Sequence, residues 1–272
     1  MYGCEEKDVA HYNCHLIEGS IEINGNLDKY PWENVPKSQL VDLVTGESAF
    51  MKTEIAALWD KDYFYVAFWI EEPNVQAYLR KRDSLIYTEN DIELFIAGED
   101  CYYEFQINAL GTIYEVFYIW QDAYTKQSRF NCSEFDLLTR KVDVLGGFQD
   151  VLRYNKHPRG RRWAFMDWDF PGLKTAVDVQ GSLNDNSDRD IGWTVELAFP
   201  WKSMSSLFGK NYIPKIDNLI RVNFSRFEKL SYNDNIPKFH PGWSLNSHGV
   251  YDSHITSCFS FVHLANILQN KY

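Results

Sequence analysis

The segment Cys101–Glu115 constrains the fold of this chain more than any other, because it is typical of two β-strands joined by a tight turn at Gly111. Along its first strand, Tyr103, Phe105 and Ile107 share one face. The opposite face carries a ring, an acid and two amides: Tyr102, Glu104, Gln106 and Asn108. The alternation predicts a sheet with one side in a core and the other side facing either solvent or a polyhydroxylated ligand.

Further strand patterns follow one another along the chain and are separated by turn-forming residues. They cover Ile21–Gly25, Thr53–Trp59, Tyr63–Glu71, Asp91–Ala97, Thr112–Trp120, Lys174–Gln180, Trp193–Phe199, Leu219–Phe227 and Phe259–Leu264. The stretch 200–209 has Pro at its start and Gly at its end, which is typical of one short helix. About ten strands and one helix predict an all-β fold, an antiparallel β-sandwich of jelly-roll type.

The same patterns predict the organisation of the chain. We expect residues 1–20 to form a polar N-terminal tail, residues 21–264 to form one β-sandwich domain and residues 265–272 to form a C-terminal tail. Residues 121–168 are irregular in pattern, and a connection of that length is commonly functional or mobile.

Charge and hydropathy exclude several classes of partner. The formal net charge of −11 repels the phosphates of nucleic acids and anionic lipids, so neither is an expected partner. No apolar run approaches 18 residues, so no membrane span is expected. Neutral glycans, cations and basic proteins remain compatible with this charge, and the sequence leaves the oligomeric state open.

The five cysteines form no C-x-x-C pair, so neither a zinc site nor a redox site is indicated. Their odd number argues against a disulfide scaffold, although one bridge is allowed. The stretch around Cys4 resembles the junction at which bacterial lipoproteins are cleaved and lipidated, but this sequence lacks the apolar region of a signal peptide. An extracellular, periplasmic or lipid-anchored location is therefore a hypothesis.

Seven segments, in order, resemble the family 9 carbohydrate-binding modules and their stand-alone bacterial relatives, over about residues 20–262. The hairpin L-W-D-K-D-Y-F-Y-V-A and the strand Y-Y-E-F-Q-I-N-A-L-G are two of them. The segments are Ile23–Asp28 with Pro31 and Trp32, Leu58–Ala67, Asn90–Ile96, Tyr102–Gly111, Trp168–Val177, Gly192–Trp201 and Arg221–Arg226.

The resemblance implies a β-sandwich that holds the end of a xylan- or cellulose-type chain, or a related mono- or disaccharide. Two aromatic rings would sandwich one sugar, while an acid, a basic residue and an amide would bond its hydroxyls. Carried over by position, the first ring is Tyr87, the acid Glu93 and the amide Asn108. The basic position is Gln106, which lacks the five-donor fork of an arginine.

The second ring should come from the segment 243–254. The residues that follow it, Ile255–Phe259, lack the Pro, Glu and Gly of the family pattern, and both Tyr251 and His254 remain candidates. Trp168 lies beside the long irregular stretch and is free to meet a ligand. The alternatives are an edge aromatic for Tyr87 and a solvent-facing carboxylate for Glu93.

A calcium site is a further hypothesis. Asn184, Asn186, Asp188 and Asp190 place side-chain oxygens at every second position, which suits a hard cation. The Gly and Glu of an EF-hand loop are absent, and Asn- and Asp-rich turns arise more often from local hydrogen bonding. No cofactor is therefore required by the sequence, and calcium is only a possible ligand.

Non-catalytic carbohydrate binding, as part of polysaccharide degradation, is the function that these residues and the resemblance predict. One alternative is a glycoside-active enzyme that would use carboxylates such as Glu93, Glu104 and Glu115. A second is an adaptor β-sandwich whose sugar site has decayed. The histidines form no metal-ligand motif, and neither a nucleophile elbow nor a phosphate-binding loop occurs, so catalysis is not expected.

Overall fold

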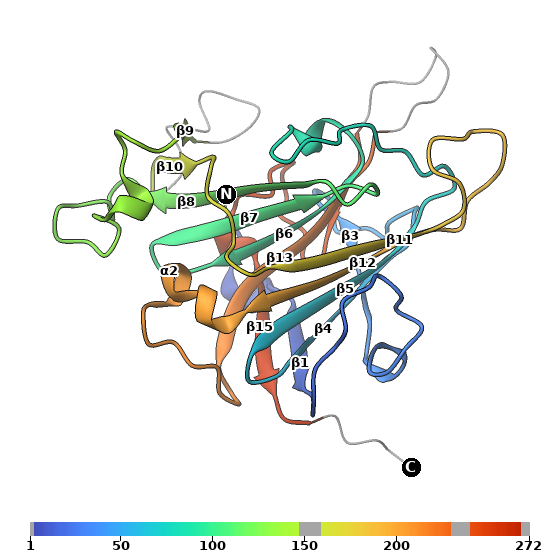
Figure 1. Cartoon of the computed structure of the whole chain (residues 1–272), viewed down its shortest axis with the longest axis horizontal. Coiled ribbons are helices and arrows are strands. Elements are labelled where there is room, and N and C mark those ends of the chain that lie inside the picture. Colours follow the sequence, from blue (N-terminus) through green and yellow to red (C-terminus); the bar gives the residue numbers. More distant parts are fainter. Residues whose placement is uncertain (1–2, 147–158, 230–239, 268–272) are drawn as a thin grey trace.

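The computed structural model describes residues 3–146, 159–229 and 240–267. These residues form fifteen strands of one hydrogen-bonded sheet, which folds over on itself (Figure 1). The main path of the sheet runs β11-β12-β5-β4-β1-β15-β13-β6-β7-β8-β10-β9. Most neighbours in this path are antiparallel, while β1 is parallel to both β15 and β4.

The longer strands agree closely with the periodic segments of the sequence. They are β1 (His11–Leu16), β4 (Thr53–Trp59), β5 (Tyr63–Glu71), β6 (Asp91–Ala97), β7 (Cys101–Ile107), β8 (Ile113–Trp120), β11 (Lys174–Gln180), β12 (Gly192–Pro200), β13 (Leu219–Phe227) and β15 (Ser260–Ala265). The short strands are β2 (Ser38–Gln39), β3 (Val41–Asp42), β9 (Val142–Leu145), β10 (Arg162–Phe165) and β14 (Gly242–Ser244). The predicted all-β sandwich is confirmed, and most of the additional strands are too short to show a period.

Helical turns are few and brief. The predicted helix is a 3-10 turn, η5 (Trp201–Ser203), followed by α2 (Ser205–Phe208). The other 3-10 turns are η1 (Glu6–Asp8), η2 (Trp32–Asn34), η3 (Ile86–Thr88), η4 (Ser133–Phe135) and η6 (Thr256–Cys258). Within the described ranges, no helix is long and apolar enough to cross a membrane.

The core lies between the two layers of the folded sheet. Phe199 on β12 contacts Tyr103 and Phe105 on β7, with ring centroids 6.2 and 6.0 Å apart. Phe68 on β5 contacts Phe224 on β13 at 6.2 Å. These strands are not neighbours in the sheet, so the rings meet across the sandwich. Burial of such rings is the main source of stability for the fold.

The expected N-terminal tail is wrong over residues 11–16, which form β1. Tyr12 and Cys14 are buried, whereas His11 and Asn13 are exposed. The strand alternates like the others. Its outer side carries polar residues, and its inner side carries the ring of Tyr12, the thiol of Cys14 and Leu16. Pairing with β15 and β4, far away in the sequence, gives β1 its place in the sheet.

Candidate functional site

The outer face of β6, β7 and β8 carries a row of polar and aromatic side chains. The register places Glu93 opposite Gln106, and Gln106 opposite Tyr114. Because side chains alternate along a strand, all three point away from the core, together with Glu104 on β7 and Tyr118 on β8. They line a cavity of about 330 Å³.

The walls of this cavity come from segments that are distant in the sequence. Tyr87 belongs to η3, and Phe227 and Lys229 belong to the end of β13 and the residues after it. The remaining wall residues come from β9, from β10 and the turn after it, and from the loop after β14. They are Asp143, Val144, Leu145, Ala164, Met166, Tyr251, Asp252, Ser253 and His254.

Gln106 links the floor of the cavity to one of its walls. Its Nε2 donates to Glu104 Oε1 at 2.7 Å and to Glu93 Oε1 at 3.1 Å. Its Oε1 accepts from the backbone N–H of Tyr87 at 3.1 Å. Both N–H donors of this amide are therefore engaged within the protein, so Gln106 positions Tyr87 and the two acids instead of offering these donors to a ligand.

The two carboxyl groups of the floor are almost fully buried. Burial raises the pKa of Glu104 to about 7, against the opposing effect of its hydrogen bonds from Tyr118 and Gln106. Burial, together with the charges of Asp91 and Glu104, raises the pKa of Glu93 well above its usual range. The pair therefore carries less than its full negative charge near neutral pH.

The rings of the cavity differ in accessibility. Tyr87 is 38% exposed and meets the ring of Tyr114 edge to face, with centroids 5.9 Å apart. Tyr251 is partly exposed and meets Phe227 edge to face at 5.5 Å. His254, in contrast, is 1% exposed. The two tyrosines are thus the better platforms for a ligand.

His254 is held as part of the wall. Its Nδ1 lies 2.9 Å from the hydroxyl of Tyr102, and its ring packs against Phe95 and Tyr118. Burial and the nearby charge of Arg162 lower the pKa of His254 well below its usual range, so the ring is neutral at physiological pH.

Two of the predicted ligand residues lie elsewhere. Asn108 donates to the carbonyl of Leu79 at 2.9 Å and accepts from the N–H of Thr112 at 3.0 Å, so its side chain fixes the turn after β7. The expectation that Trp168 is free to meet a ligand is wrong. Its side chain is 3% exposed and packs in the core against Phe117, with ring centroids 4.8 Å apart.

The four candidate calcium ligands make hydrogen bonds within the protein. Asp190 accepts from the N–H groups of Val75 and Ser182 at 2.8 and 2.6 Å. Asn184 accepts from the N–H of Ala77, Asn186 accepts from Gln76 and Asp188 accepts from Ser182. The described residues contain no cluster of three or more His, Cys, Asp or Glu side chains that could share a metal ion. Calcium binding stays a prediction.

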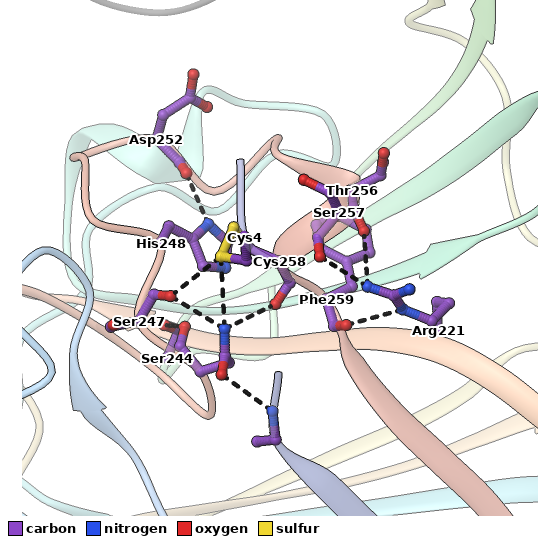
Figure 2. Close-up of a disulfide and its surroundings, with 12 residues drawn as sticks. Cys4, Arg221, Ser244, Ser247, His248, Asp252, Thr256, Ser257, Cys258 and Phe259 are labelled. Carbon is purple, nitrogen blue, oxygen red and sulfur yellow. Dashed lines mark hydrogen bonds between the residues drawn. A yellow bond between two sulfur atoms is a disulfide. The ribbon is translucent and has the colours of Figure 1, made fainter. Parts of the chain in front are cut away.

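The loop after β14, which carries Tyr251 and His254, is fastened to the N-terminal segment (Figure 2). A disulfide joins Cys4 to Cys258. Asn246 reinforces it, accepting from the N–H of Ala10 at 3.0 Å and donating to the carbonyl of Cys258 at 3.3 Å.

The disulfide also bears on the expected processing of the N-terminal segment. The sulfur of Cys4 is consumed by this bond, so it cannot also carry the lipid of a lipoprotein. The two partners are 254 residues apart in the sequence, and no spacing signal in the sequence joins them.

Solved structures of carbohydrate-binding proteins share this fold over nearly their whole length. Two are of a family 9 carbohydrate-binding module from Caldicellulosiruptor kristjanssonii, in complex with cellotriose and with glucose, with TM-scores of 0.52 and 0.50 and identities of 12% and 13%. The alignments cover 96% and 95% of this chain and 97% and 98% of theirs.

A third structure is of a protein from Bacteroides uniformis proposed to bind carbohydrate, with a TM-score of 0.55 and 12% identity. Its alignment covers 94% of this chain and 99% of that one. No protein-family model matches this chain, and no curated protein is similar to it in sequence. The β-sandwich implied by the resemblance is therefore confirmed as a fold.

Proposed function

We propose that this protein binds carbohydrate in the outer-face cavity and does not transform it. The observation that carries the proposal is the composition of the cavity, where tyrosine rings surround a floor of carboxyl groups. Rings pack on the C–H faces of a sugar, and carboxyl groups exchange hydrogen bonds with its hydroxyls. The sugar complexes with the same fold support the proposal.

Tyr87 and Tyr251 would supply the platforms in this account, and Glu93 and Glu104 the polar contacts. A cavity of about 330 Å³ lies at the small end of the range for ligand pockets, about 300–1,000 Å³. The ligand would accordingly be a mono- or disaccharide, or the end of a longer chain. Polysaccharide degradation would provide such a ligand, because it releases short saccharides and new chain ends.

Thermal-shift and calorimetric titrations against gluco-, xylo-, galacto- and manno-saccharides test the proposal. Binding of a saccharide to the folded state raises the melting temperature, because the free energy of unfolding rises by RT ln(1 + [L]/Kd). Tyr87→Ala should weaken binding by about tenfold while the domain stays folded. Tyr78→Ala is the matched control, since Tyr78 is 62% exposed and does not line the cavity.

A glycoside-active enzyme is the second candidate, and one observation favours it. Glu93 and Glu104 both hydrogen-bond the same nitrogen of Gln106, so two carboxyl groups with raised pKa values lie close together. Both, however, project from one floor instead of flanking a ligand from two sides. Turnover of nitrophenyl glycosides that is abolished by Glu104→Gln would establish the enzyme and remove the first proposal.

We also infer that the protein works in an oxidising compartment, either the periplasm or the cell exterior. The Cys4–Cys258 disulfide supports this location, because such bonds persist where thiols are not kept reduced. Thiol labelling of the protein purified from its native compartment, without reductant, tests the inference. Labelled Cys4 and Cys258 would contradict it.

A further inference from the structure

Six glutamates of the described residues are buried, and four of them have a basic partner. Glu196 pairs with Lys29, Glu115 with Arg82, and both Glu72 and Glu228 with Arg226. The two without a Lys or Arg partner in the described part of the chain are Glu93 and Glu104. These are the two that line the cavity.

The hydrogen bonds of this pair come mainly from neutral groups. Glu93 accepts from the amide of Gln106 and from the hydroxyl of Ser225 at 3.3 Å. Glu104 accepts from the hydroxyl of Tyr118 at 2.6 Å and from Gln106. The nearest ionisable nitrogen is Nε2 of His254, 3.8 Å from Glu104, on a ring that burial keeps neutral. The fold therefore gives these two acids no directly bonded counter-ion: Arg162 acts on Glu104, and Lys229 on Glu93, only through space.

Other titratable groups face the cavity from every element around it, and acids outnumber bases. They are Tyr87 from η3, Asp91 beside Glu93 on β6, Tyr114 and Tyr118 on β8, Asp143 on β9, Lys229 after β13, and Tyr251, Asp252 and His254 in the loop after β14. Lys229 interacts electrostatically with both Asp91 and Glu93, without a hydrogen bond to Glu93. Arg162 donates to the hydroxyl of Tyr102, and its charge also lowers the pKa of Glu104.

We propose that the cavity selects saccharides that carry a free, protonated amino group, whose ammonium would lie against Glu93 and Glu104 as their missing counter-ion. The proposal rests on the proposed function and names the ligand class of the same site. The surrounding tyrosine rings favour a cation as well, since their faces attract positive charge. An N-acetylated or plain neutral sugar would leave the acid pair uncompensated.

The proton balance of binding follows from the same groups. The pKa of Glu104 is raised to about 7 in the empty cavity, so this carboxyl holds a proton over part of the neutral range, and burial raises the pKa of Glu93 as well. An ammonium placed beside them favours their ionised form, and the protons go to the buffer. The affinity for an amino sugar should therefore increase as the pH rises toward about 7, the pKa of Glu104, and decrease at higher pH, where the sugar amine loses its own proton.

Calorimetric titrations with glucosamine, glucose and N-acetylglucosamine, and with the galacto and manno equivalents, test the proposal at pH 6 and 7, where the sugar amine is mostly protonated. We expect one amino sugar to bind at least roughly tenfold more tightly than its neutral partners. Its binding should release protons, seen as a heat that depends on the ionisation enthalpy of the buffer. Equal affinity for the three forms of a sugar would overturn the inference and leave the proposed function intact.

Variants of Glu93 and Glu104 test whether these two acids cause the preference for amino sugars. Glu104→Gln and Glu93→Gln should each bring the amino-to-neutral affinity ratio close to one, and either serves if the other fails to fold. Glu54→Gln removes the same charge from an ion pair on β4, outside the cavity, and should keep the ratio. Ethanolamine is the non-sugar control, and binding as tight as that of glucosamine would overturn the proposal. Absence of binding by every saccharide would instead contradict the proposed function.

Discussion

The buried Glu72–Arg226–Glu228 cluster and the Glu93–Gln106–Glu104 group place similar acids in opposite settings. In the first, the guanidinium of Arg226 lies 2.8 Å from Glu228 and 3.7 Å from Glu72, and Asn90 donates to both acids. In the second, the central group is a neutral amide.

The difference separates a structural from a functional use of buried acids. The first cluster contains its own directly bonded cation, and Trp193 and Asn90 provide further donors to Glu72. The second keeps its acids at the floor of a cavity with their charge only partly satisfied. A buried acid with no directly bonded cation is costly, and the proposed role in binding would account for its retention beside a cavity.

Removal of Arg226 should have the largest effect on stability. Arg226→Met leaves Glu72 and Glu228 buried without their cation, which costs about 3–5 kcal/mol in the free energy of unfolding. Denaturant unfolding at pH 7.5 measures this loss. A change below about 1 kcal/mol would show that the cluster is not the structural element that its geometry indicates.

The second largest effect should be on the pH dependence of stability, which reports on Glu104 at the floor of the cavity. Glu104 has a higher pKa in the folded state than in the unfolded chain, so the folded protein binds more protons and loses stability as the pH rises from about 4.5 to about 7. That loss amounts to about 3 kcal/mol if this group acts alone.

Glu115 and Glu228 also have pKa values raised to about 7, so Glu104→Gln should make this part of the curve less steep without removing the slope. The measurement is the free energy of unfolding at several pH values between 4.5 and 8, for the wild type and the variant side by side. Two parallel curves would mean that Glu104 titrates normally and that the floor is open to water.

Gln106→Leu should have the smallest effect of the three, and it concerns binding more than stability. The variant loses the hydrogen bond that Gln106 accepts from the N–H of Tyr87, so the ring of Tyr87 is held less firmly. Saccharide affinity should therefore fall about tenfold. Because the effect acts through Tyr87, the losses in Gln106→Leu and Tyr87→Ala should not add in the double variant. Additive losses would assign Gln106 a separate role.

The strand periodicity was sufficient to predict the β-sandwich and the outer face of β7. The family resemblance, carried over by position, supplied Tyr87, Glu93, Gln106, Tyr251 and His254, all of which line the cavity. Tyr114 and Tyr118 were missed, although they alternate along β8 as Glu104 and Gln106 do along β7. The alternation along β8 is therefore a sufficient signal to predict both tyrosines on the outer face.

Other features had no local signal in the sequence. Met166 and Lys229 reach the cavity because the sheet order brings β10 and β13 to either side of β6, β7 and β8. Partners 254 residues apart form the disulfide. Trp168 was misplaced because an irregular stretch can be packed as tightly as a strand, and Asn108 because a polar side chain at a turn can serve its own backbone.

Methyl NMR of methionine-labelled protein during a saccharide titration tests the central claim most directly. Met166 lines the cavity, whereas Met51 and Met204 are buried and do not line it. The account predicts that a binding saccharide shifts the Met166 methyl signal along a saturable curve and leaves the other two signals nearly unchanged. A saccharide that binds by calorimetry without moving the Met166 signal would place its site elsewhere and contradict the account.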